Sequence, residues 1–415
     1  MMKRLTGRGA GLLVVVSLLL AACGGDGPQA GAPAGGVPHG YVEGAEETAE
    51  TQSRLIVADA GTGLVHVVDL ITEQVVPAGR VDGVRGITGD GRFGYLTGRD
   101  GSVRVVDSGS WMVDHGDHVH YYRAPVREVG VVPGIVPSSG PGAGPVAAYS
   151  DPAVTAVSFP NGTTSLLDRA KLDKGSVAEL ATIARTAHLS TAVPYRERVL
   201  ASVADPGQRH ARGVRVHDRQ GNPVAEVAQP CPELQGQAVT RRGVVFGCAD
   251  GALLVTEKDG AFTGEKIPYP RQVDPGERAI RFTHRPGSST LTAPAGDSGA
   301  WLLDTARRTW RRIETGPLAA VNAVGEGAPL LALTRDGILR AYDTTTGAER
   351  ARTQLMAPEA TTLAAAPSIQ IDNTRAYVNN PSSGQVYEID YNDGLRRART
   401  LTVGGKASHI VETGR

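Results

Sequence analysis

A hairpin pattern that recurs from about residue 54 to the C-terminus is the feature that most constrains the fold. In each unit, two runs of alternating apolar and polar residues flank a glycine turn, as in VVFGCADGALLVTEKDG, and a second turn follows an acidic residue. About eight units, or alternatively seven, follow one another at spacings of roughly 38 to 50 residues. Four short strands at this period are typical of a β-propeller. We therefore expect an all-β protein with about eight four-stranded blades over residues 54–415.

The two ends of the repeat region indicate how the ring closes. The first unit, near Arg54, begins with what resembles a second strand, and the C-terminal ASHIVETGR resembles an innermost strand without a sheet of its own. Pairing the two would close the propeller and remove an exposed sheet edge. The stretch VAELATIARTAHL has a helix-like composition, but its place in the repeat predicts a strand and a connector. The repeated aspartates are expected to accept hydrogen bonds from turn amides.

The N-terminus has the pattern of an export signal. Basic residues precede the apolar run GLLVVVSLLLAA, which is too short to span a bilayer but suits a secretory signal at residues 1–22. The following Cys23 lies in a sequence that resembles a bacterial lipobox, which predicts a lipid-anchored protein at the outer face of the cytoplasmic membrane. An ordinary signal peptide is the alternative. Residues 23–53 are rich in Gly, Ala and Pro and then in acids, which predicts a flexible tether.

Two further cysteines, Cys231 and Cys248, lie 17 residues apart in the part of the chain expected outside the cytoplasm. This pair favours a disulfide, and a thiolate metal site is the alternative, although the paired spacing of zinc ribbons is missing. The formal net charge is zero, so nothing in the charge balance favours nucleic acid.

The stretch DHGDHVHYYR, residues 114–123, holds three of the ten histidines. It lengthens one connection between units, and His118 and His120 would point the same way on an extended segment. Asp117 and His115 could bind the same ion or orient the imidazoles. Such a set suits Zn²⁺, and Cu²⁺ would also bind it. We expect the two following tyrosines to be packing residues.

Three other histidines occupy equivalent positions just before innermost strands of later units. They are His188, His284 and His409, and Gln235 stands at the matching place of another unit. In a propeller these segments enter one rim of the central channel, so we expect these imidazoles to converge. The prediction is that they supply the other half of a zinc site begun by His118 and His120. His66, His210 and His217 are expected to be structural or solvated.

Motifs for catalysis are missing from the sequence. It has no HExxH, no GxSxG, no P-loop and no dinucleotide fingerprint, which favours a binding protein over an enzyme. A cell-surface propeller that serves only as a protein-interaction platform is the main alternative to a metal-transfer protein. A channel-centred lactonase or quinone-dependent dehydrogenase is a third, but the histidine-dominated set fits neither well.

Several segments together resemble a known family. They are DHGDHVHYYR, AHLSTAVP, CPELQGQA with FGCADG, FTHRPG and SHIVETG, and they span the whole expected propeller. The chain resembles the AztD-type zinc metallochaperones, extracytoplasmic propellers associated with zinc ABC importers. The resemblance implies zinc binding and delivery to a solute-binding protein, with His118, His120, His188, His284 and His409 as ligand candidates. Two departures stand out: the N-terminal segment offers only His39, and Gln235 replaces an expected histidine.

Overall fold

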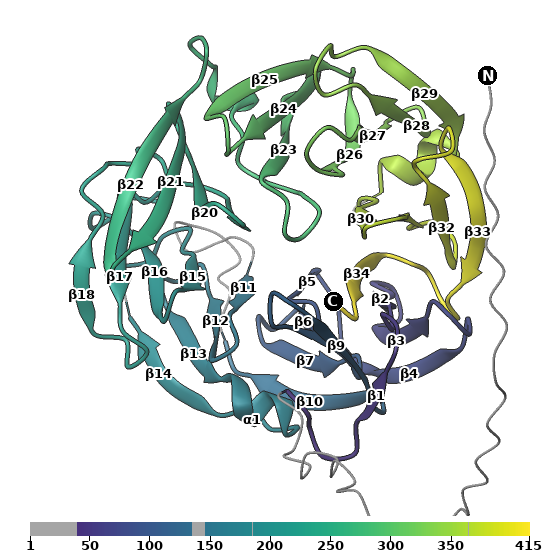
Figure 1. Cartoon of the computed structure of the whole chain (residues 1–415), viewed down its shortest axis with the longest axis horizontal. Coiled ribbons are helices and arrows are strands. Elements are labelled where there is room, and N and C mark those ends of the chain that lie inside the picture. The colour runs from purple at the N-terminus through teal and green to yellow at the C-terminus, as the bar shows by residue number, and fades with distance from the viewer. Residues whose placement is uncertain (1–39, 135–145, 185, 364) are drawn as a thin grey trace, which may run out of the picture. The chain divides into compact units, whose positions relative to one another are not determined.

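The computed structural model describes residues 40–134, 146–184, 186–363 and 365–415. Antiparallel sheets follow one another around a ring, and Figure 1 shows the last strand lying beside the first strands of that ring. The prediction of an all-β propeller is confirmed. No helix in these ranges has the length and apolar character needed to cross a membrane. The expected signal, the expected lipidation site Cys23 and His39 lie outside the described residues.

The strands follow the predicted hairpins, and each sheet runs from an inner strand beside the central channel to an outer strand at the periphery of the ring. In that order, the first sheets contain β34 (His409–Thr413), β2 (Arg54–Ala58), β3 (Leu64–Asp69) and β4 (Val75–Arg80); β5 (Gly86–Gly89), β6 (Phe93–Thr97), β7 (Val103–Asp107) and β10 (Arg127–Val132); β11 (Ala147–Ser150), β12 (Val154–Ser158), β13 (Thr164–Asp168) and β14 (Glu179–Ile183); and β15 (Ala192–Tyr195), β16 (Arg198–Val203), β17 (Gly213–His217) and β18 (Pro223–Glu226). The later sheets contain β19 (Gln237–Thr240), β20 (Gly243–Cys248), β21 (Gly251–Lys258) and β22 (Ala261–Pro268); β23 (Thr290–Ala295), β24 (Gly299–Asp304) and β25 (Thr309–Glu314); β26 (Leu318–Ala323), β27 (Leu330–Thr334), β28 (Ile338–Tyr342) and β29 (Glu349–Gln354); and β30 (Ile369–Ile371), β31 (Ala376–Asn380), β32 (Gln385–Asp390) and β33 (Arg396–Thr402). The helical turns are α1 (Arg169–Asp173), η1 (Pro275–Glu277) and η2 (Pro358–Thr361).

Local chemistry explains these elements. Residues 179–183 of the stretch with helix-like composition form strand β14, because they pair with β13 as the repeat requires. The aspartates after strands accept turn amides, as predicted: Asp69 accepts from Thr72 at 2.9 Å and Asp343 accepts from Thr345 at 2.7 Å. The apolar faces of neighbouring sheets pack together, and a buried side chain such as Phe246 contributes about 1.5–3 kcal/mol.

The ring closes through the C-terminal strand, which confirms the prediction. Strand β34 is antiparallel to β2, with Ala58 opposite His409 and Arg54 opposite Thr413. The amide of Gly414 also donates to the carbonyl oxygen of Gly91 at 2.7 Å, which joins the end of the chain to the next sheet. Closure therefore pairs an edge of β2 that would otherwise stay open.

The closing strand carries a buried acid with a raised pKa. The Glu412 side chain is 1 % exposed and its Oε2 lies 2.7 Å from Nη1 of Arg415. Burial raises the pKa of Glu412 to about 7, although Arg415 opposes that shift. The folded state therefore holds this proton more tightly than the unfolded chain, whose ordinary value is 4.5. This group makes the free energy of unfolding fall as pH rises from about 4.5 to 7.

We expect Glu412→Gln to remove that loss. From pH 5 to pH 8, the free energy of unfolding of the native chain should fall by up to about 3 kcal/mol more than that of the variant. The reason is that one pKa unit corresponds to about 1.4 kcal/mol. Urea unfolding at the two pH values measures this difference. Glu359→Gln, at an exposed glutamate of η2, is the matched control and should show none. Equal pH dependence of the native chain and Glu412→Gln would contradict the prediction.

One three-stranded sheet stands apart from the repeat. It consists of β1 (Glu46–Thr48), β9 (Val119–Arg123) and β8 (Ser110–Asp114), in the order β1-β9-β8. The tether was expected to reach residue 53, whereas β1 pairs here with β9. The physical reason is that β9 offers an open edge, so a segment without an apolar core of its own gains backbone hydrogen bonds from it.

The two cysteines of the described chain form the expected disulfide. Cys231 and Cys248 are joined with their Cα atoms 5.0 Å apart, and both side chains are buried. The bond connects the segment before β19 to the end of β20. Because their sulfurs are bonded to each other, these residues offer no thiolate to a metal.

Candidate metal centre

The candidate site lies on the hairpin between β8 and β9. The four residues His115–His118 form its loop, in which the amide of His115 donates to the carbonyl oxygen of His118 at 3.0 Å. Gly116 has a φ of +88°, a conformation that glycine adopts without strain, and its amide donates to Asp114 at 2.7 Å. This tight turn brings the three histidines of the stretch to one end of the hairpin.

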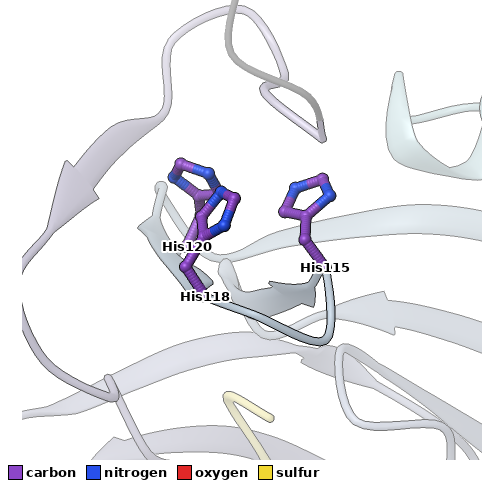
Figure 2. Close-up of side chains that lie close together, drawn as sticks. All are labelled: His115, His118 and His120. Carbon is purple, nitrogen blue, oxygen red and sulfur yellow. The ribbon is translucent and has the colours of Figure 1, made fainter.

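Three imidazoles gather there and point to the same side of the hairpin (Figure 2). One ligand nitrogen from each of His115, His118 and His120 lies within 4.8 Å of the others. The ring centroids of His118 and His120 are 4.9 Å apart, and those of His115 and His118 are 4.8 Å apart. His115 and His118 are exposed, while His120 is partly buried. The hairpin therefore presents a cluster of nitrogen donors to solvent.

Two carboxylates form hydrogen bonds with the Nδ1 atoms of two of these rings. Oδ1 of Asp117 lies 2.8 Å from Nδ1 of His118, and Oε1 of Glu47 lies 2.6 Å from Nδ1 of His120. The hydrogen bond with His118 keeps the pKa of Asp117 below its usual range. A carboxylate on Nδ1 fixes the tautomer and leaves Nε2 as the nitrogen that can bind a metal. Asp117 is thus placed where it could orient the His118 ring, which is one of the two roles predicted for it.

Sequence reasoning missed Glu47. This residue lies in the acidic run EGAEETAET, which was expected to belong to the tether, yet β1 places it beside β9 with Glu47 opposite Tyr122. The sequence feature that indicates such an approach is an acidic run in a chain that also has a histidine-rich loop. That feature does not say which of the neighbouring acids approaches the loop.

A group of ion pairs around the buried Asp107 lies at the base of the hairpin. Asp107, at the end of β7, is 1 % exposed and accepts hydrogen bonds from both Arg92 and Arg127. It also accepts the amide of Gly109 at 2.9 Å, in the turn that leads into β8. The direction in which β8 leaves the propeller is therefore fixed by buried charges.

The histidines of the later repeats are not part of this cluster. Within the described ranges, the group able to hold a metal consists of His115, His118 and His120. His188 is fully buried, with Nδ1 2.6 Å from the carbonyl oxygen of Thr186 and Nε2 2.9 Å from the hydroxyl of Ser202. Both of its nitrogens are thus used within the protein. This geometry differs from the half-site that the repeat positions predicted.

The other two rim histidines are also held by backbone. Nε2 of His284 lies 2.9 Å from the carbonyl oxygen of Val239, and burial lowers its pKa to about 4. Burial also lowers the pKa of His409, which has a backbone hydrogen-bond partner at Val84. Gln235 lines a cavity of about 500 Å³ together with residues of several inner strands. Tyr122 is buried, as expected of a packing residue. His217 is buried with Nδ1 2.8 Å from the carbonyl oxygen of Gly221, which agrees with the structural role that was one of its two expected states.

Comparison with known proteins supports the resemblance inferred from sequence. The zinc chaperone AztD of Citrobacter koseri is 24 % identical over 382 residues, which cover 88 % of this chain and 87 % of that protein. A crystal structure of Citrobacter koseri AztD superposes with a TM-score of 0.72 at 21 % identity, covering 88 % of this chain and 98 % of that one. The chain resembles AztD. The structure of apo AztD from the same organism gives a TM-score of 0.73 at 20 % identity, again over 88 % of this chain and 98 % of that chain. No family model matches the chain.

The histidine cluster of this AztD-like chain fits the coordination chemistry of zinc. Zinc binds imidazole nitrogen at about 2.0–2.1 Å, so two ligands of a tetrahedral site lie about 3.3 Å apart. The donor nitrogens lie within 4.8 Å of one another, and the exposed side chains of His115 and His118 can close that difference by rotating toward His120. Three protein ligands leave the fourth position of a tetrahedron open. That donor number is typical of a site at which a ligand can enter.

Proposed function

We propose that this chain binds zinc at His115, His118 and His120 and delivers it to the solute-binding protein of a zinc ABC importer. It does so outside the cytoplasm, anchored by a lipid on Cys23. The observation that carries the proposal is the cluster of three imidazoles, two of them exposed and one partly buried, on a hairpin outside the propeller sheets. The similarity to a zinc chaperone over most of the chain supports it. The role is binding and transfer, with no catalytic step.

The geometry suggests how zinc leaves without becoming free in solution. Three imidazoles occupy three positions of the tetrahedron, and a ligand of the acceptor protein enters the fourth. Because His115 and His118 are exposed loop residues, each can then rotate away in turn while the acceptor adds its own donors. His120 lies on β9 and is held by Glu47, so it is expected to release last.

A metal-binding measurement tests the proposal directly. The purified chain is stripped with a chelator and reloaded, and zinc is counted by elemental analysis beside a variant with all three histidines replaced by alanine. We expect one zinc per native chain and none in the variant. Equal zinc in both would place the site elsewhere. No zinc in either would favour the interaction platform without a metal function.

We also expect Glu47→Ala to weaken zinc binding about 10- to 100-fold, the usual effect of removing a group that orients a metal-bound histidine. Without the carboxylate, the His120 ring loses the acceptor that lies 2.6 Å from its Nδ1. Competition with a chromophoric chelator measures the affinity. The matched control is Glu46→Ala, the neighbouring glutamate of β1, which is opposite Arg123 and has no place in the cluster. Equal losses in the two variants would contradict the prediction.

A further inference from the structure

A column of planar groups joins the buried ion pairs of the propeller to the histidine hairpin. The guanidinium carbon of Arg92 lies 3.6 Å from the centre of the Trp111 ring. Trp111 stacks on Tyr122 with centroids 5.4 Å apart and planes 23° apart, and Tyr122 stacks on His120 at 6.2 Å and 21°. The last group of the column is thus the imidazole that we assign to zinc.

The column has little freedom to move. Arg92 is held by two hydrogen bonds to Asp107, and Trp111 and Tyr122 are both buried. In the hairpin register Trp111 is opposite Tyr122 and Val113 is opposite His120, which places these side chains on one face. Aromatic and cation–π contacts of this kind fix ring planes as well as positions. The stack therefore restricts the plane in which the His120 ring lies.

Trp111 also holds the segment that carries the second carboxylate. Its Nε1–H donates to the carbonyl oxygen of Gly40 at 3.1 Å. Gly40 packs so closely on the hairpin that a Cβ built on it would lie 2.2 Å from Cγ2 of Val113. From Gly40 the chain passes through a short turn to β1, where Glu47 accepts the hydrogen bond of His120. One indole thus contacts Tyr122, which stacks on the imidazole, and Gly40, from which the chain leads to Glu47.

We propose that Trp111 is a positioning residue of the zinc site, which fixes the His120 ring through Tyr122 and the Glu47 segment through Gly40. This inference rests on the proposed zinc function. Trp111 does not touch the metal. It narrows the orientations of His120 before zinc arrives, so that less ordering is required when zinc binds.

The test compares zinc affinities of full-length variants by chelator competition. Trp111→Leu removes both the stack and the indole N–H, and we expect an affinity loss of about 10- to 100-fold. Trp111→Phe keeps an aromatic ring in the column and should recover part of that loss. Trp310→Leu, which disrupts a separate aromatic cluster with Tyr269 and Trp301, is the matched control and should leave zinc affinity unchanged.

A double-mutant cycle separates positioning from general destabilisation. If Trp111 acts through His120, Trp111→Leu should have no further effect in a His120→Ala background but should still lower affinity in a His115→Ala background. An unchanged affinity in Trp111→Leu, or an equal loss in both backgrounds, would overturn the proposal. Failure of the native chain to bind zinc would instead contradict the proposed function, so the two failures are distinguishable.

Discussion

Replacing His120 by alanine is expected to lower zinc affinity by more than about 100-fold, beyond the usual effect of losing an orienting group. His120 combines three features that the other two histidines share only in part. Its backbone lies on strand β9, its Nδ1 is bonded to Glu47, and its ring ends the column that begins at Arg92. His120 is therefore the zinc donor that loses the least conformational entropy when zinc binds. Chelator competition at constant pH measures the loss.

The controls for this prediction come from the same chain. His210→Ala removes a histidine that is not in the cluster and should change zinc affinity by less than about twofold. His409→Ala tests the repeat-based prediction, because it removes a rim imidazole that has its own backbone partner. Thermal unfolding of each apo variant shows whether the fold survives. A loss in His409→Ala as large as that in His120→Ala would move the site to the channel rim.

The fold could be predicted because its signals are local. Alternating runs such as VVFGCADGALLV specify strands β20 and β21 and the turn between them, and the same plan recurs along the chain. Ring closure could be predicted as well, since a first unit short of one strand and a last strand without a sheet complete each other. Composition alone would have predicted a helix where β14 forms, whereas the position of this stretch in the repeat predicts the strand.

The site could be predicted only where its residues are neighbours in sequence. His115, His118 and His120 come together because one turn of four residues connects them. Glu47 approaches them across more than 70 residues through β-pairing of a segment with almost no apolar side chains. That segment has no strand-like sequence pattern of its own. It forms a strand because the open edge of β9 offers it backbone hydrogen-bond partners.

Repeat position indicates where a backbone lies and says nothing about what its side chain contacts. His188 and His284 do precede β15 and β23, as the alignment of repeats required, whereas His409 is the first residue of β34 itself. Their ring nitrogens nevertheless interact with backbone carbonyls or a serine hydroxyl in their own surroundings. A buried imidazole in a propeller meets many such acceptors, so satisfying it within the fold competes with metal binding.

The second large effect is expected at the base of the hairpin, where Asp107→Ala should lower the free energy of unfolding by about 3–5 kcal/mol. The substitution removes the carboxylate that Arg92 and Arg127 share. The Arg92 side chain is 4 % exposed, so its buried charge would keep Asp173, at 3.3 Å, as its acidic partner. The substitution also frees the amide of Gly109 in the turn into β8. Urea unfolding of the apo chain, analysed for both midpoint and slope, measures the loss.

The matched control is Asp82→Ala, which removes the exposed carboxylate beside Arg80 and should cost no more than about 1 kcal/mol. Asp107→Ala should also weaken zinc binding when measured under conditions where the variant stays folded. The reason is that Arg92 would lose the anion that holds it against Trp111, and the His120 ring would lose the fixed end of its column. If Asp107→Ala and Asp82→Ala were equally stable, the buried ion pairs would not be what anchors the hairpin.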